Sequence, residues 1–282
     1  MVKPSVAYTE IRKVKGTDIV VAEDTLAAEE PLEIRLEYGP VGERIQKSVS
    51  ITMRTPGNDI ELATGFLFSE GIIARKEEID NICHLNYGCQ EGNGDNIIVA
   101  SLAENVKPDI QKLERHFYTT SSCGVCGKAS IGAIRTIFNK INSEDDLLVS
   151  ASLFYSLPDR LRNAQDIFGD TGGLHASAMF DNNGNIIVLR EDVGRHNALD
   201  KVLGYLLSNS IQNIDNQILL LSGRASFELI QKAAMAGIKI VAAVGAPSSL
   251  AVQLAKEFDI TLIGFLRGQR FNIYSAEKRI TI

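Results

Sequence analysis

Long hydrophobic runs are missing from this chain of 282 residues. The most apolar stretches, NQILLLSG and IKIVAAVGA, are far shorter than the roughly 20 apolar residues that a membrane-spanning helix needs. The N-terminal stretch MVKPSVAYTEIRKVKG contains no apolar run of signal-peptide length. We therefore expect a cytoplasmic protein that neither spans a membrane nor is exported.

An excess of positive charge is also missing. The chain has 29 Lys and Arg against 35 Asp and Glu, a formal net charge of −6, which argues against a general electrostatic affinity for nucleic acid. A local basic pocket remains open. Hydrophobic residues make up 45% and charged residues 23%, as in ordinary globular proteins, and the length allows one large domain or two ordinary ones. There is no internal repeat and no low-complexity linker.

Cysteine is scarce, with four residues in the chain. Two of them, Cys123 and Cys126, form a C-x-x-C pair in the stretch TTSSCGVCGKAS. Cytosolic thiols are mostly kept reduced, so this spacing indicates metal binding or catalysis before a structural disulfide. For the other two, Cys83 and Cys89, the simplest interpretation is that they are ordinary packed or surface thiols.

Three chemistries compete for the C-x-x-C pair. A structural zinc site needs four ligands, and the C-x5-C spacing of Cys83 and Cys89 is loose for it, although His84 and His116 are possible substitutes. A thioredoxin-type dithiol is expected after a strand, whereas the preceding YTTSS is typical of a loop. The third possibility is that the pair acts as a nucleophilic sulfur carrier.

The sulfur-carrier reading has a chemical mechanism. A thiolate attacks sulfur electrophiles, and Lys128 and the amides of a following helix favour that charged form. Gly124 and Gly127 give the loop the backbone freedom to meet a sulfur donor and then an acceptor. One cysteine would carry the sulfur as a persulfide.

Residues 1–116 are predicted to form a small α+β domain. The stretches PLEIRLEY, RIQKSVSITMR and DNIIVASL have the β-branched, alternating composition of strands. The stretch MRTPGNDIELATGFLFSEGII predicts a helix that Asn58 or Asp59 caps and Gly71 ends. Its apolar face is expected to hold Ile60, Ala63 and Leu67, with Leu62 and Phe66 alongside.

Residues 117–282 are predicted to form an α/β domain that starts with the C-x-x-C loop and a helix after it. The stretch LHASAMFDNNGNIIVLRED indicates a β-hairpin, because DNNG between two apolar runs is a strong turn signal. Helix RHNALDKVLGYLL follows, with an apolar stripe, and then strands QILLLSG, KIVAAVGA and ITLIGFLRG alternate with two further helices. This alternation predicts a mostly parallel sheet covered on both faces.

Polar loops gather where these strands end: REDVGRHN, SGRAS, GAPSS and LRGQR. A parallel sheet places ligands at the carboxyl ends of its strands, and helix N-termini suit anions. The arginines expected on this rim are Arg190, Arg195, Arg224, Arg267 and Arg270. The set favours a phosphate-bearing ligand over plain helix capping with surface arginines.

Two histidines lie close to this rim in the sequence. His175 falls within the hairpin and His196 starts a helix. Each is a candidate for proton transfer, and each is equally a candidate for a hydrogen-bonded structural histidine.

Several motifs together resemble those of a known family. The stretches MRTPGNDIELATGFLFSEGII, SSCGVCGK, REDVGRHNALDK, SGRASFELIQKA, APSSLAV and GFLRGQRFNIY are similar, in the same order, to the formate dehydrogenase accessory sulfurtransferase family, FdhD. The resemblance covers nearly the whole chain. It implies that a cysteine desulfurase supplies persulfide sulfur, which passes to the molybdenum cofactor, Mo-bis(molybdopterin guanine dinucleotide), for the client enzyme formate dehydrogenase.

The same resemblance assigns residues. It implies that Cys123 carries the persulfide with Cys126 as its partner. The cofactor-binding stretch that it implies is Phe265, Leu266, Arg267, Gly268, Gln269 and Arg270. It also implies a cytidine-deaminase-like core and a homodimer.

The comparison with cytidine deaminases also indicates whether the chain has ligands for zinc. Zinc deaminases take ligands from a P-C-x-x-C motif, and the matching place here has Pro247 followed by two serines and no cysteine, so no structural metal is expected. The alternatives to a sulfurtransferase are a non-catalytic chaperone for the cofactor and a zinc-clipped structural protein.

Overall fold

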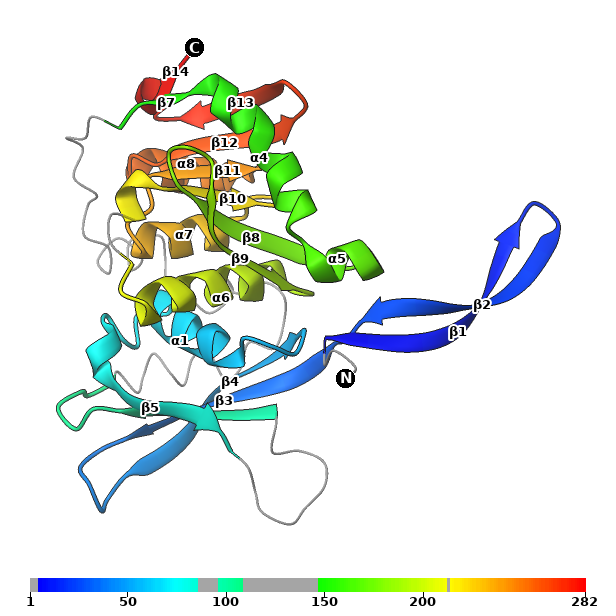
Figure 1. Ribbon diagram of the computed structural model, residues 1–282. Helices are drawn as coiled ribbons and strands as arrows, with labels where there is room; N and C mark the ends of the chain where they lie inside the picture. Colours follow the sequence, from blue (N-terminus) through cyan, green and yellow to red (C-terminus); the bar gives the residue numbers. More distant parts are fainter. Residues whose placement is uncertain (1–4, 86–95, 109–146, 212–213) are drawn as a thin grey trace.

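The structure is a computed structural model that describes residues 5–85, 96–108, 147–211 and 214–282. Figure 1 shows a layered body and one long hairpin that projects from it. None of the helices among these residues is long and apolar enough to cross a membrane. The C-x-x-C loop, the helix predicted after it and the domain boundary predicted at 116/117 lie outside the described residues.

A four-stranded sheet forms one outer layer of the body. Its order is β4-β3-β6-β5, and the strands are β3 (Glu30–Tyr38), β4 (Ile45–Arg54), β5 (Ile79–His84), which the short helix η1 (Lys76–Glu78) precedes, and β6 (Ile97–Leu102). The three strands predicted in this region are confirmed as β3, β4 and β6. Alternate side chains of β3 are fully buried toward helix α1 (Asp59–Ser69), as strands with one covered face require.

Helix α1 confirms the predicted helix but not all of its contacts. The helix ends at Ser69 with Glu70 as its C-cap, and Gly71 follows with φ 69°, in agreement with the predicted stop. Asn58 is the N-cap residue, but its side chain makes no capping hydrogen bond. Ile60 is 43% exposed, so its predicted place on the buried face is wrong. The reason is Asp59, which turns inward to an ion pair with Arg54 (2.8 Å) and leaves the next side chain pointing outward.

A six-stranded mixed sheet forms the second layer. Its order is β13-β12-β11-β10-β8-β9, with β8 (His175–Phe180), β9 (Ile186–Asp192), β10 (Ile218–Leu221), β11 (Ile240–Ala243), β12 (Thr261–Arg267) and β13 (Arg270–Ser275). Only β10, β11 and β12 are mutually parallel. The parallel arrangement predicted for these three strands is confirmed, but the sheet as a whole is mixed rather than mostly parallel, because the hairpins β8–β9 and β12–β13 add antiparallel pairings at both sides.

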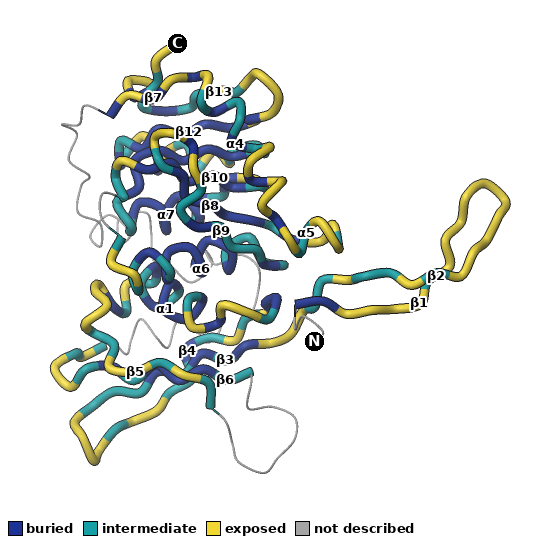
Figure 2. Tube along the Cα trace, viewed as in Figure 1, coloured by how far each residue is buried: buried dark blue, intermediate teal, exposed yellow. Residues whose placement is uncertain are grey.

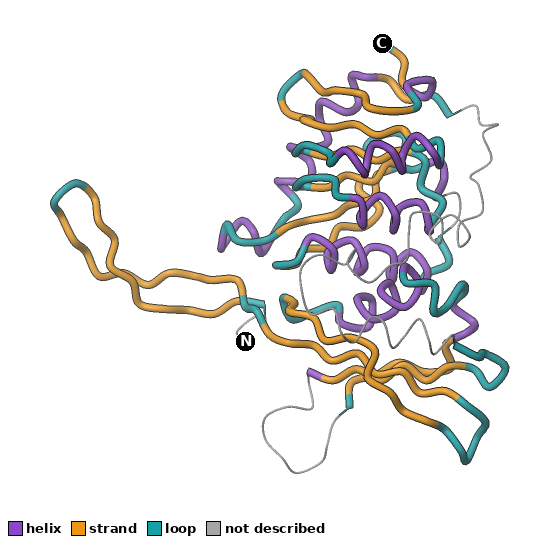
Figure 3. Tube along the Cα trace, turned by 180° about the vertical axis from the view of Figure 1, so that it is seen from behind, coloured by secondary structure: helices purple, strands orange, loops and turns teal. Residues whose placement is uncertain are grey.

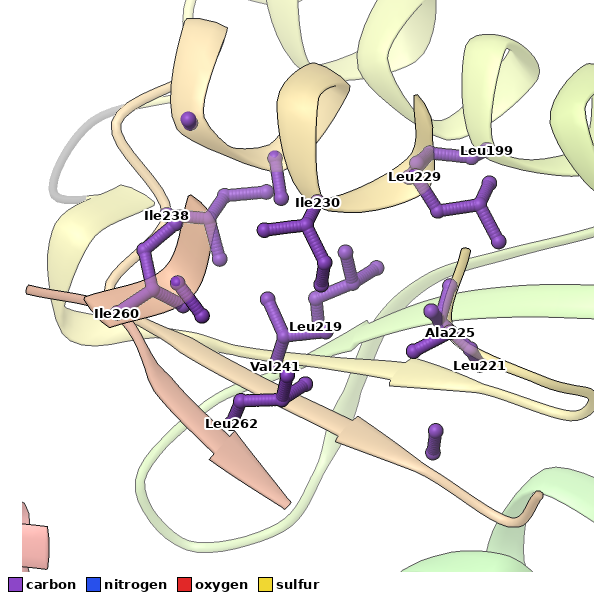
Figure 4. Packing of buried hydrophobic residues seen from close by; sticks show 14 of the residues in the cluster. Leu199, Leu219, Leu221, Ala225, Leu229, Ile230, Ile238, Val241, Ile260 and Leu262 are labelled. Atoms are coloured by element: carbon purple, nitrogen blue, oxygen red, sulfur yellow. The ribbon is translucent and has the colours of Figure 1, made fainter. Parts of the chain in front are cut away.

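Helices cover both faces of this sheet, as the continuous apolar strands predict. One face packs against α6 (Arg195–Ser208), α7 (Phe227–Met235) and α8 (Ser249–Glu257), and the other against α4 (Ala151–Asn163). In Figure 4, Ile230 of α7 lies over Leu219 and Val241 of the strands. The predicted stripe of α6 is confirmed: Leu199, Val202, Leu203 and Leu206 are all buried. Short elements complete the domain: α5 (Asp166–Thr171), η3 (Ile214–Asn216), η4 (Glu277–Arg279) and the pair β7 (Val149–Ser150) and β14 (Ile280–Thr281).

Helices α1 and α6 join the two layers and lie between the two sheets (Figures 1 and 3). They cross at two glycines. A Cβ on Gly65 would lie 1.8 Å from the carbonyl oxygen of Asp200, and one on Gly204 would lie 1.9 Å from that of Glu61. No side chain larger than hydrogen fits at either position, so the two glycines set the separation of the layers.

The projecting hairpin, which we call the arm, consists of β1 (Val6–Lys15) and β2 (Asp18–Ala27). It leaves the body between α5 and the four-stranded sheet (Figures 1 and 3), and most of it is exposed (Figure 2). These strands are not among the elements predicted from the sequence. Charged residues interrupt the apolar positions of both, so neither shows the one-sided alternation of a half-buried strand.

Candidate functional site

Three of the four cysteines, Cys89, Cys123 and Cys126, lie outside the described residues. The fourth, Cys83, is a free, exposed thiol in β5, with the side-chain amide of Asn81 3.7 Å from its sulfur. This agrees with the expectation of an ordinary surface thiol. Among the residues that the structure describes, no group of three or more His, Cys, Asp or Glu side chains could hold a metal ion.

The predicted rim exists where β10, β11 and β12 end, and its loops touch through backbone. The amide of Gly245 donates to the carbonyl oxygen of Gly223 (2.9 Å), and the amide of Phe265 donates to that of Gly245 (3.0 Å). A Cβ on Gly245 would come within 2.9 Å of the Gly223 oxygen. Glycine is needed there because the SGRAS and GAPSS loops pack directly against each other.

Four basic residues of the predicted motifs gather at one end of this rim. His175, at the start of β8, lies against the SGRAS loop, because a Cβ on Gly223 would be 3.2 Å from its Nδ1. Burial lowers the pKa of His175, and the positive charges of Arg195, His196 and Arg224 lower it further. His175 is therefore an uncharged imidazole near neutral pH, surrounded by cationic groups.

Arg195 and Arg224 give this cluster its spare hydrogen-bond donors. The Nε of Arg195 is buried and meets no acceptor among the described residues. Arg224 is exposed and makes no ion pair within the same residues. A buried donor without a partner loses the free energy of a hydrogen bond, so an anion or a water molecule that reached Arg195 would be stabilised.

His196 has partners at the start of α7, namely its N-cap residue and its first turn. Its Nε2 lies 3.4 Å from the hydroxyl oxygen of Ser226 and 3.9 Å from Oε2 of Glu228. Interaction with the His196 ring lowers the pKa of Glu228 to about 2, and the Ser226 hydroxyl and the amide of Glu228 itself act in the same direction. His196 is thus held by side chains of the fold, which supports its structural interpretation.

The other predicted arginines do not all join this cluster. Arg190 points to the layer of α1 instead, where its Nη2 donates to Glu61 (2.7 Å) and its guanidinium lies 4.9 Å from the centroid of the Tyr205 ring. Its predicted place on the rim is wrong, because it lies on β9, the edge strand that faces α1.

The segment Phe265–Arg270 is the tip of the β12–β13 hairpin. Arg267 and Arg270 are paired across a turn formed by Gly268 (φ 58°) and Gln269, and all four are exposed. Phe265 has φ 54° and is 37% exposed, whereas Leu266 is fully buried in the core below. The hairpin therefore extends past the rim with two guanidinium groups at its end.

Much of the motif REDVGRHNALDK is structural. The ammonium group of Lys201 pairs with Asp192 (2.7 Å) and donates to the carbonyl oxygen of Thr55 (2.9 Å). Asn197 donates to the carbonyl oxygen of Met53 (2.8 Å). Lys201, Asp192 and Asn197 are buried, so they bind the two layers together rather than a ligand. Sequence spacing contains no signal for the contacts to Thr55 and Met53, which join residues more than a hundred positions apart.

A second buried network lies between α6 and α7. Nζ of Lys232 is 2.8 Å from one carboxylate oxygen of Asp200, to which the Ser69 hydroxyl also donates. Burial disfavours both charges and raises the pKa of Asp200, but the carboxylates of Asp200 and Glu70 outweigh it for Lys232, whose pKa is raised. The lysine therefore stays charged and paired.

The fold and the rim together define a mixed α/β protein with a cationic sheet edge suited to an anionic ligand. The FdhD/NarQ family model matches residues 27–281. This chain belongs to the FdhD/NarQ family.

Relatives agree with this assignment over the full length. A protein of Streptomyces avermitilis named sulfur carrier protein FdhD is 50% identical over 97% of this chain and 96% of its own length. One of the same name from Mycobacterium tuberculosis is 45% identical over 98% of both chains. The crystal structure of a formate dehydrogenase accessory protein from Desulfotalea psychrophila has 25% identity and a TM-score of 0.73, covering 99% of this chain and 100% of that one.

Proposed function

We propose that this protein is a sulfur carrier that serves formate dehydrogenase, as the names of its relatives indicate. In this proposal Cys123 accepts sulfur from a cysteine desulfurase. The Cys123 thiolate attacks the terminal sulfur of the donor persulfide, a new S–S bond forms, and the donor cysteine leaves as a thiolate. The step needs no external oxidant or reductant. Cys126 assists the transfer onward.

The acceptor that we propose is the molybdenum cofactor in its guanine-dinucleotide form, held at the rim. The observation that carries this part is the cluster around His175: Arg195 has a buried donor that meets no acceptor among the described residues, and the exposed Arg224 belongs to the same cluster. Phosphate oxygens match guanidinium donors in charge and geometry. An uncharged His175 adds a ring nitrogen without competing for the anion.

The hairpin tip supports the same ligand. Arg267 and Arg270 face each other across a tight turn, and like charges placed opposite in a strand pair are destabilising unless an anion lies between them. Gly268, with no side chain, lets a ligand approach the backbone closely. Leu266 and Phe265 hold the hairpin in place, Leu266 from within the core.

The experiment separates sulfur loading from cofactor binding. Wild-type protein incubated with a cysteine desulfurase and cysteine should gain a reducible sulfur adduct by intact-mass spectrometry, and Cys123→Ala should not. Arg267→Ala and Arg270→Ala should weaken binding of GDP by about ten- to a hundredfold in calorimetry, the cost of one charge-assisted hydrogen bond, with loading intact.

Arg75→Ala is the matched control, because Arg75 is an exposed arginine (75%) beside η1 in the other layer. Its affinity for GDP should equal that of wild type. An adduct that persists in Cys123→Ala would move the chemistry to another thiol. Normal GDP binding in both hairpin variants would remove the tip from the site. Cofactor binding with no loading at all would favour the chaperone.

A further inference from the structure

The ring of His175 has no hydrogen-bond partner at the candidate site. His175 is the first residue of β8 and is partly buried, and its ring makes no hydrogen bond to any residue that the structure describes. Its Nδ1 lies against the backbone of the SGRAS loop, because a Cβ built on Gly223 would be 3.2 Å from it. An imidazole in this state can both bond to a ligand and take up a proton.

Four charged or titratable side chains face the His175 ring. Arg195 and His196 come from the first turn of α6, Arg224 comes from the SGRAS loop, and Asp192 is the strand partner of His175 in β9. Burial lowers the pKa of His175, the three basic groups lower it further, and Asp192 acts in the opposite direction. The ring is therefore neutral in the free protein at neutral pH.

The carboxylates next to this cluster already have partners of their own. Asp192 is fully buried and lies 2.7 Å from Nζ of Lys201, and it also accepts hydrogen bonds from two backbone amides. Glu228 is the neighbour of His196, with 3.9 Å between Oε2 and Nε2. Within the part of the chain that the structure describes, the two arginines of the cluster consequently have no counter-ion. A bound anion would supply the missing negative charge.

We propose that His175 is a ligand-binding residue of the rim and that it takes up one proton from solvent when a phosphate group binds beside it. The proton joins a ring nitrogen, and no other covalent bond forms or breaks. The imidazolium then donates to a phosphate oxygen, next to the guanidinium groups of Arg195 and Arg224. This role rests on the anion site of the proposed function and couples that site to pH.

The direction of the pH effect follows from the charges. In the free protein the neighbouring arginines oppose a positive ring, whereas a bound phosphate brings negative charge close to it. The pKa of His175 is therefore higher in the complex than in the free protein, and binding takes up protons at pH values between the two. Lowering the pH through that range tightens binding. The gain ends once the ring of the free protein is itself protonated.

The other described histidines are less suited to this role. The Nε2 of His196 already has Glu228 within 3.9 Å, so an anion at the rim changes its surroundings less. His84 lies at the end of β5 in the other layer, where its Nε2 is 3.7 Å from a carboxylate oxygen of Asp59. His175 differs from both because the carboxylate nearest to it in the sheet, Asp192, is paired with a lysine.

NMR titration of the histidine rings tests the proposal on the full chain. The chain has four histidines, so the signal that is lost in His175→Gln identifies this ring. Sulfate is the first probe, because its charge is constant over the range in which histidine titrates, and chloride holds the ionic strength fixed. Saturating sulfate, and GDP in separate samples, should move the titration midpoint of His175 upward by about one pH unit. The midpoint of His84 should not move.

Calorimetry of GDP binding counts the protons. Heats measured in two buffers of different ionisation enthalpy give the number of protons taken up for each GDP bound. A phosphate group itself titrates at about pH 6, so the comparison with His175→Gln isolates the ring. Wild type should take up more protons than this variant. Its affinity relative to the variant should rise about tenfold as the pH falls below the midpoint of the free protein, as a shift of one pH unit requires.

His84→Gln is the matched control, since it removes a histidine from the other layer. It should keep the wild-type proton uptake and the wild-type affinity for GDP. GDP binding without a shift of the His175 midpoint, or with equal proton uptake in wild type and His175→Gln, would overturn this role of His175 and leave the anion site in place. A wild type that binds neither GDP nor sulfate would overturn both.

Discussion

At the scale of single residues, the basic side chains of the rim divide into free and occupied groups. Within the part of the chain that the structure describes, Arg195 and Arg224 have unused donors, whereas His196 is held by Ser226 and Glu228. Arg190 is occupied by Glu61. The side chains that can meet a ligand are therefore the ones that the fold leaves without partners.

The pair of His196 and Glu228 predicts a pH dependence of stability. The pKa of Glu228 in the folded protein, about 2, lies below its ordinary value of 4.5. Folding thus stabilises the ionised carboxylate, and this contribution is present above about pH 5 and lost as the pH falls toward 2. Glu228→Gln should lower the free energy of unfolding by about 1 kcal/mol at pH 7, allowing for solvent screening.

Urea unfolding at pH 7 and pH 3.5 measures this difference. The difference between wild type and Glu228→Gln should shrink at the lower pH. Glu77→Gln, at an exposed carboxylate, is the control and should differ from wild type by less than about 0.5 kcal/mol at both. A difference that grows on acidification would show that the pair does not stabilise the fold.

At the scale of elements, the crossing of α1 and α6 sets how closely the two layers of the fold approach each other. The backbones touch at Gly65 and Gly204, so the helices approach more closely than ordinary side chains allow. The same two helices hold Asp59, Ser69 and Asp200 in buried polar contacts. The MRTPGND and REDVGRHN motifs thereby meet at one place.

Gly65→Ala should be severely destabilising. Its Cβ would lie 1.8 Å from a backbone oxygen that has no freedom to move, so α1 and α6 must separate. The expected loss is about 3 kcal/mol or more in the free energy of unfolding, at or above the upper end of ordinary overpacking. Urea unfolding measures it.

Gly169→Ala is the matched control. Gly169 also lies in a helix, α5, but a Cβ there meets nothing within 4 Å. Alanine favours helix over glycine, so this variant should be neutral or slightly more stable. Similar stability of the two variants would show that the crossing can open without cost.

At the scale of the whole molecule, the buried ion pair of Lys201 and Asp192 helps to hold the two layers together. Lys201 is 2.7 Å from Asp192, and both are almost fully buried. The ammonium group also reaches the carbonyl oxygen of Thr55 in the other layer. The layers should consequently unfold together in one transition.

Lys201→Met should cost about 3–5 kcal/mol, because it leaves the Asp192 carboxylate buried and without its cation. Lys76→Met is the control: Lys76 also links the layers, through the carbonyl oxygen of Ser208 (2.6 Å), but at an exposed site, and its loss should cost less than about 1 kcal/mol. Calorimetry would record both. Equal melting temperatures for the two variants would contradict the claim that the buried ion pair stabilises the contact between the layers.

Features that depend on residues close together in the chain could be predicted from the sequence, whereas features that depend on distant residues could not. Local patterns determined the strands β3, β4 and β6, the β8–β9 hairpin with its DNNG turn, and the stripe of α6, because each depends on residues close together in the chain. They also placed the SGRAS, GAPSS and LRGQR loops on one rim, since the strands before them are parallel neighbours.

Only the tertiary structure decided the mixed pairing of the sheet, the partner of Arg190 and the buried roles of Asp192, Asn197 and Lys201. Each depends on a neighbour that is distant in sequence, as Thr55 is from Lys201. Sequence recognised these polar residues as a motif, but a polar residue looks the same whether it meets a ligand or a buried partner. Burial and distance separate the two cases, and both arise only when the layers pack.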